Sequence, residues 1–60
     1  MGRKCILVVD DEISMIKFLR ANLENKGYKV LAAMNGAEAL QTIERGLPDL
    51  IVQPSSLLLL

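Results

Sequence analysis

The chain is poor in the residues that most small catalytic and metal-binding domains use. Among its 60 residues there is no histidine, no tryptophan and one cysteine, Cys5. A single thiol without histidine cannot form an internal disulfide, a zinc site or a Cys–His catalytic pair. The serines likewise have no histidine to activate them, and no glycine-rich phosphate loop is present. We therefore expect a non-enzymatic protein.

Excess charge of one sign is also missing. Seven basic residues balance seven acidic ones. Nucleic-acid and membrane-surface binding rely on surplus positive charge, so we expect neither partner. The apolar runs Cys5–Val9 and Leu57–Leu60 are far shorter than the ~20 residues of a membrane span, and three acids follow the first at once. These features favour a cytoplasmic protein.

Apolar residues make up 52% of the sequence and fall into alternating strand-like and helix-like segments. Cys5 to Val9 is a continuous apolar run rich in β-branched residues, typical of a strand buried on both faces of a parallel sheet. Apolar residues then recur at three- and four-residue steps until Gly27, which predicts a helix from Ile13. The remaining predicted elements are a strand over Tyr28–Ala32, a helix from Asn35 to Gly46 whose start resembles a capping box, and a strand over Leu50–Val52 that Pro54 interrupts.

This β-α-β-α-β order predicts an α/β fold, half of an open doubly wound parallel sheet. Right-handed crossovers place the first strand between the other two, with one helix on each face. Ligands of such sheets bind at the carboxyl ends of the strands, where the strand order reverses. In this chain, that point lies beside the first strand, which Asp10 and Asp11 follow directly.

The acidic run Asp10, Asp11 and Glu12 has two interpretations. Converging carboxylates suit a hard cation such as Mg²⁺, which prefers oxygen ligands. Alternatively, the acids serve the start of the following helix, where negative charge is favourable and where one of them, or Ser14, could act as the cap. The spacing of the residues leaves both interpretations open.

Five segments in matching order and spacing resemble the receiver domain of two-component response regulators. They are Ile6–Glu12, Gly27–Val30, Asn35–Gly36, Glu38–Leu40 and Pro48–Val52, and the resemblance covers residues 4 to 52. It implies the N-terminal half of a flavodoxin-like (βα)₅ fold, with a histidine kinase as the partner. It also implies that Asp10 and Asp11 hold Mg²⁺, with Asp11 favoured as the direct ligand and Glu12 a weaker candidate.

The resemblance fails at the position that matters most for phosphorylation. After Pro48–Val52 the family has one apolar residue and then the phosphoacceptor aspartate, whereas this chain has Gln53 and Pro54. Proline has no nucleophilic oxygen, and Asp49 matches an aspartate that is not the acceptor. We therefore expect no phosphoacceptor and a Mg²⁺ site weakened by the loss of its carboxylate.

The expected organisation is a partial receiver domain over residues 1–52 and a divergent apolar tail over residues 53–60, as in a truncated receiver. A third strand with an open edge, together with Leu57–Leu60, predicts a homo-oligomer. The alternative function is that of a self-associating structural half-fold without signalling activity. Mg²⁺ affinity separates the two hypotheses.

Overall fold

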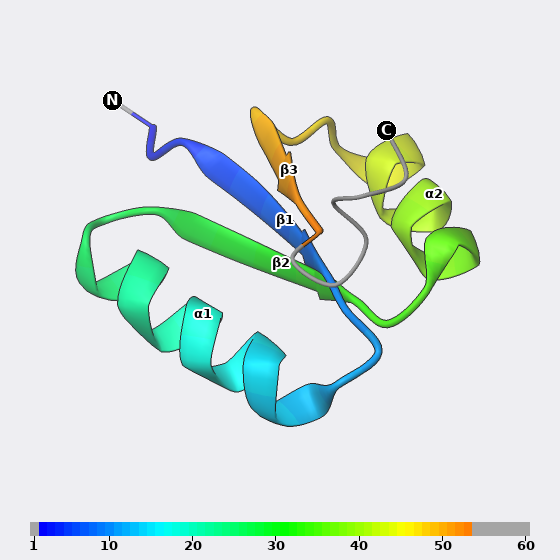
Figure 1. The fold of residues 1–60 in the computed structure, drawn as a ribbon. Helices are drawn as coiled ribbons and strands as arrows, with labels where there is room; N and C mark the ends of the chain where they lie inside the picture. Colours follow the sequence, from blue (N-terminus) through cyan, green and yellow to red (C-terminus); the bar gives the residue numbers. More distant parts are fainter. Residues whose placement is uncertain (1, 54–60) are drawn as a thin grey trace.

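The computed structural model describes residues 2–53 as a three-stranded parallel sheet with two helices (Figure 1). The strand order is β2-β1-β3, which places β1 in the middle as predicted. The second strand lies one residue later than predicted. The elements in chain order are β1 (Cys5–Val9), α1 (Ile13–Asn25), β2 (Lys29–Ala33), α2 (Gly36–Arg45) and β3 (Leu50–Val52).

Each face of the sheet carries its own apolar layer because strand side chains alternate between faces. Leu7 and Val8, neighbours on β1, point to opposite faces and are both fully buried. Figure 1 shows α1 on one side of the sheet and α2 on the other. The layer under α1 contains Ile6, Val8, Ile16 and Val30, and the layer under α2 contains Leu7, Val9, Ala33 and Ala39. The predicted arrangement, with one helix on each face, is confirmed.

Helix α1 ends in a Schellman motif at the predicted glycine. Gly27 has a φ of 95°, a backbone conformation that residues with a Cβ rarely adopt. The Gly27 N–H donates to the Glu24 carbonyl at 2.9 Å, and the Tyr28 N–H donates to the Leu23 carbonyl at 3.1 Å. Leu23 and Tyr28 both pack against the apolar layer under α1. This turn therefore ends α1 and leads the chain directly into β2.

Helix α2 begins with the predicted capping residue. Asn35 Oδ1 accepts from the Glu38 N–H at 2.9 Å, and Glu38 Oε1 accepts from the Met34 N–H at 2.8 Å. The return bond reaches the residue before the cap, one position earlier than in the usual capping box. Two otherwise unpaired donors at the start of α2 are thus satisfied.

Strand β3 is short and is attached to β1 through Asp49, the residue that precedes it. The Asp49 N–H donates to the Cys5 carbonyl at 2.7 Å, and Asp49 Oδ2 accepts from the Cys5 N–H at 2.7 Å. Leu50 and Ile51 keep 56% and 45% of their surfaces exposed. Two of the three residues of β3 therefore bury little apolar surface, and hydrogen bonds to β1 hold this end of the strand in place.

No helix within residues 2–53 combines the length and the apolar character that a membrane crossing requires.

We predict that Asp49→Ala loosens β3 selectively. The variant removes the acceptor of the Cys5 N–H, and a lost hydrogen bond of this kind costs ~1 kcal/mol, or about fivefold in the opening equilibrium. Amide hydrogen exchange at Ile51 should accelerate by about that factor, while Leu31 in β2 changes little. Asp49→Asn, which keeps a side-chain oxygen, is the control and should lie close to the unmodified chain. Equal acceleration in β2 and β3 would contradict this account.

Candidate functional site

The acidic residues that follow β1 form a corner at the carboxyl end of the central strand. The Asp10 N–H donates to the Ala33 carbonyl at 3.1 Å, which joins this corner to the end of β2. The acids therefore lie where parallel sheets of this type bind ligands. The backbone of two strands fixes their position.

Asp10 is the buried member of the acidic run, with 5% of its surface exposed. Its Oδ1 accepts from the Glu12 N–H at 2.9 Å, a side-chain-to-backbone bond that closes a tight turn between β1 and α1. No buried side-chain nitrogen or oxygen within residues 2–53 lacks a hydrogen-bond partner. Asp10 thus stabilises the turn, and one of its two carboxylate oxygens is used in that hydrogen bond.

Asp11 and Glu12 are both exposed. Glu12 occupies the N-cap position of α1 in an extended conformation, with φ −109° and ψ 113°. Its carbonyl accepts from the Met15 and Ile16 N–H groups at 3.1 and 3.2 Å, but its side chain makes no capping hydrogen bond. The expected side-chain cap of this helix is not formed by Glu12. Instead, the Asp10 side chain accepts from the Glu12 N–H, which lies before the first residue of α1.

The donor set around this corner suits a cation only in part. Mg²⁺ keeps several waters and is commonly held by one or two carboxylates, which Asp10 and Asp11 could supply. Within the described residues, no group of three or more acidic, histidine or cysteine side chains is arranged to hold a metal ion. The assignment of Asp10 and Asp11 to Mg²⁺, with Glu12 as the weaker candidate, stays a prediction.

Asp49 lies at the opposite end of the sheet from this corner. It is bonded to Cys5 at the start of β1, whereas Asp10 follows the end of the same strand. Five residues of strand separate the two positions, roughly 16 Å. Pro54, which the resemblance assigns to the phosphoacceptor position, lies outside the described residues, as does Leu57–Leu60.

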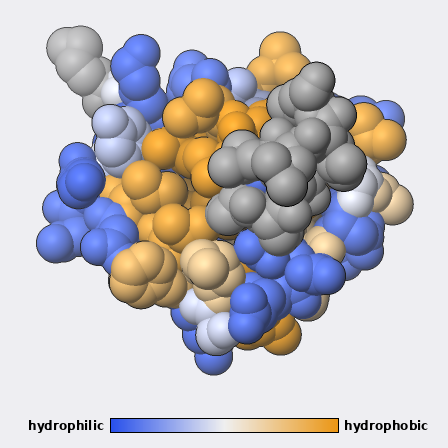
Figure 2. Space-filling model, viewed as in Figure 1, coloured by the Kyte–Doolittle hydropathy of each residue, from blue (hydrophilic) through white to orange (hydrophobic). Residues whose placement is uncertain are grey.

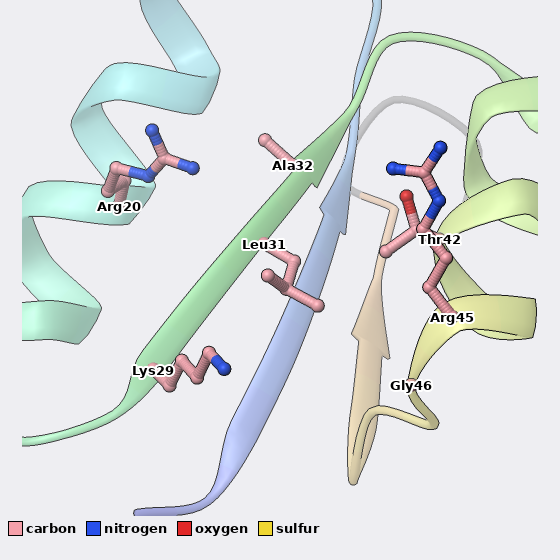
Figure 3. A pocket seen from close by; sticks show the side chains of 7 residues that line it. All are labelled: Arg20, Lys29, Leu31, Ala32, Thr42, Arg45 and Gly46. Carbon is pink, nitrogen blue, oxygen red and sulfur yellow. The ribbon is translucent and has the colours of Figure 1, made fainter.

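A second feature, which the sequence analysis missed, is a basic groove on the outer edge of β2. Its volume is ≈ 460 Å³, and its walls include Arg20 of α1, Lys29 of β2 and Arg45 of α2 (Figure 3). These three cations are far apart in the sequence and form no motif. Only the fold brings them around one strand.

Comparison with known proteins agrees with the fold. The family described as the response regulator receiver domain matches residues 6–57. The match extends five residues past Val52, the last residue of β3. The predicted boundary between the receiver part and the tail stays a prediction.

Three curated relatives illustrate the similarity. The alkaline phosphatase synthesis transcriptional regulatory protein PhoP of Bacillus subtilis is 55% identical over 49 residues, which are 82% of this chain and 20% of that protein. The probable transcriptional regulator ycf27 of Cyanophora paradoxa is 44% identical over 52 residues, 87% of this chain and 22% of the relative. The transcriptional regulatory protein KdpE of Mycobacterium tuberculosis is 40% identical over 47 residues, 78% of this chain and 21% of the relative.

This chain therefore spans about a fifth of the length of the curated relatives it matches. The family match covers most of its residues, and the observed fold is the N-terminal half of a flavodoxin-like sheet. The chain belongs to the response regulator receiver domain family of two-component signalling.

Proposed function

We propose that this chain is a cytoplasmic receiver module that keeps the acidic pair of a Mg²⁺ site but does not accept a phosphoryl group. The observation that carries the proposal is the position of Asp10 and Asp11 at the carboxyl end of the central strand, with Asp10 held by backbone contacts. Such a module acts through protein contacts, and a histidine kinase is its proposed partner.

In this proposal, Asp11 is the direct ligand because its side chain is exposed, while Asp10 supports the site from its buried position. A bound Mg²⁺ would neutralise the two neighbouring carboxylates. Pro54 has no side-chain carboxylate where the family has a third one. Affinity should therefore be weak, in the millimolar range, because ligand charge sets the strength of such sites.

Mg²⁺ titration followed by ¹H–¹⁵N NMR tests the acidic corner. We expect saturable shifts at the Asp10, Asp11 and Glu12 amides. Asp11→Asn should raise the dissociation constant by about tenfold or more, because it removes a charged ligand. Glu44→Gln, which neutralises an exposed acid on α2, is the control and should leave the titration unchanged. Non-saturating shifts shared by all acids would contradict a Mg²⁺ site at the acidic corner.

Pro54→Asp, which restores a carboxylate, should lower the dissociation constant for Mg²⁺.

Phosphoryl transfer is tested separately, with acetyl phosphate as the donor in the presence of Mg²⁺. Since proline offers no nucleophile at residue 54, we expect the intact mass of the chain to stay unchanged. A covalent adduct on Asp10, Asp11 or Asp49 would show that the loss of the family's acceptor does not abolish phosphorylation.

A second candidate function is self-association, which the exposed edge of β3 favours. Leu50 and Ile51 are large apolar residues with about half of their surfaces exposed. Figure 2 shows hydrophobic residues gathered in the middle of the viewed face, over the strands. Two copies that pair their β3 edges about a two-fold axis would cover this surface and satisfy the outward backbone groups.

Sedimentation equilibrium over a dilution series measures this association. We expect a monomer–dimer equilibrium and a melting temperature that rises with protein concentration. Leu50→Lys should shift the equilibrium toward monomer, because a two-fold axis brings two like charges together. Leu40→Lys is the matched control, since Leu40 lies on α2 and is 64% exposed. A monomer at every concentration would exclude this function.

A further inference from the structure

The outer edge of β2 is bordered by basic side chains from three elements. Figure 3 shows Arg20 extending from α1 on one side of β2 and Arg45 rising along α2 on the other, with Lys29 at the start of the strand. The groove of ≈ 460 Å³ between them runs past Leu31 and Ala32 and reaches Thr42. Both helices thus form walls along one open strand.

The backbone of β2 directs the N–H and C=O groups of alternate residues away from β1, toward this groove. The Lys29 N–H donates to the Lys4 carbonyl at 2.9 Å, and the Ala33 carbonyl accepts from the Asp10 N–H at 3.1 Å. Since hydrogen bonding alternates along a strand, the intervening Leu31 also faces β1, while Val30 and Ala32 direct their N–H and C=O groups outward. Arg20 Nη2 lies 3.5 Å from the Val30 carbonyl, on this outer side. The edge therefore presents two N–H donors and the Ala32 carbonyl.

The charge along this edge is positive although the chain as a whole is neutral. Glu24 lies 3.9 Å from Arg20, but both side chains are about half exposed, so this ion pair is weak and leaves Arg20 able to bind another anion. The cations also stand on both sides of the strand. Figure 3 places Arg20 and Arg45 beyond opposite faces of β2, an arrangement that suits an extended anion better than a compact one.

We propose that the β2 edge binds an extended acidic peptide as an added strand. The peptide backbone would pair with the outward groups of Val30 and Ala32. Its alternating side chains would point toward the two walls, where carboxylates meet Arg20 on one side and Arg45 on the other. Lys29 would add charge at the start of the groove.

This site lies apart from the acidic corner and does not depend on the proposed receiver chemistry. In the flavodoxin-like order 2-1-3-4-5, β2 is the outermost strand. The same edge thus stays open whether the sheet has three strands or five. Strand addition here therefore does not compete with pairing at the β3 edge.

Fluorescence anisotropy of the 60-residue chain with a fluorescein-labelled Thr-Glu-Glu-Val-Glu-Glu-Thr peptide at low ionic strength tests this proposal. We expect saturable binding that weakens with added salt. Arg45→Gln should weaken it by about two- to fivefold, within the range expected for one exposed ion pair. Lys17→Gln, which removes an exposed cation of α1 outside the groove, should have no effect. Equal effects of the two variants would overturn the proposal.

Backbone pairing is tested with a peptide of the same sequence that carries N-methyl groups on alternate residues. Loss of binding by the methylated peptide supports strand addition. Undiminished binding means that charge alone attracts the peptide, and this result overturns the proposal. Ala32→Pro removes an outward N–H at a position where an edge strand tolerates proline, and it should abolish binding. The methylated peptide gives the same information if that variant does not fold. Displacement of the peptide by inorganic phosphate, but not by chloride at equal ionic strength, would instead identify a compact anion site.

Discussion

Every other element of this molecule depends on β1 being covered on both faces and paired on both edges. Leu7 and Val8 lose all contact with solvent because one lies under each helix. β1 pairs with β2 over its whole length and with β3 over Ile6 to Val8. Neither helix could be stable alone at this size, since short helices in water draw most of their stability from packing. The acidic corner derives its position from the same strand, because Asp10 directly follows Val9, the last residue of β1.

The features that the sequence predicted well are those set by local chemistry or by one strong pattern. Few other structures are compatible with the apolar run of β1, a glycine at residue 27 or a capping asparagine at residue 35. These three signals were therefore enough to predict the order of the elements and the positions of both helices. The order of strands followed from the handedness of the crossovers. The one-residue error at β2 arose because Tyr28 is apolar enough to continue the strand, but its N–H serves the end of α1.

The remaining features depend on contacts between distant residues. Nothing near Asp49 in the sequence indicates that its side chain binds the N–H of Cys5, 44 residues away. The same holds for the basic groove, whose cations belong to a helix, a strand and a second helix. At the acidic corner, the sequence identified the run of acids but left their individual tasks open. The buried turn-forming role falls to Asp10, while Glu12, at the cap position, does not use its side chain to cap.

The central position of β1 also has a consequence for the order in which the molecule can be assembled during synthesis. Its register joins Ile6 to Val30 on one side and to Leu50 on the other. β1 is made before both of its neighbours, and its second neighbour, β3, is made more than forty residues later. Until then only a pair of parallel strands can form, and such pairs are slow to close because the connecting loop must be ordered first. Until β3 has been made, the nascent chain therefore carries a hydrophobic strand with one open edge, a state in which a small parallel sheet is exposed to aggregation and chaperones.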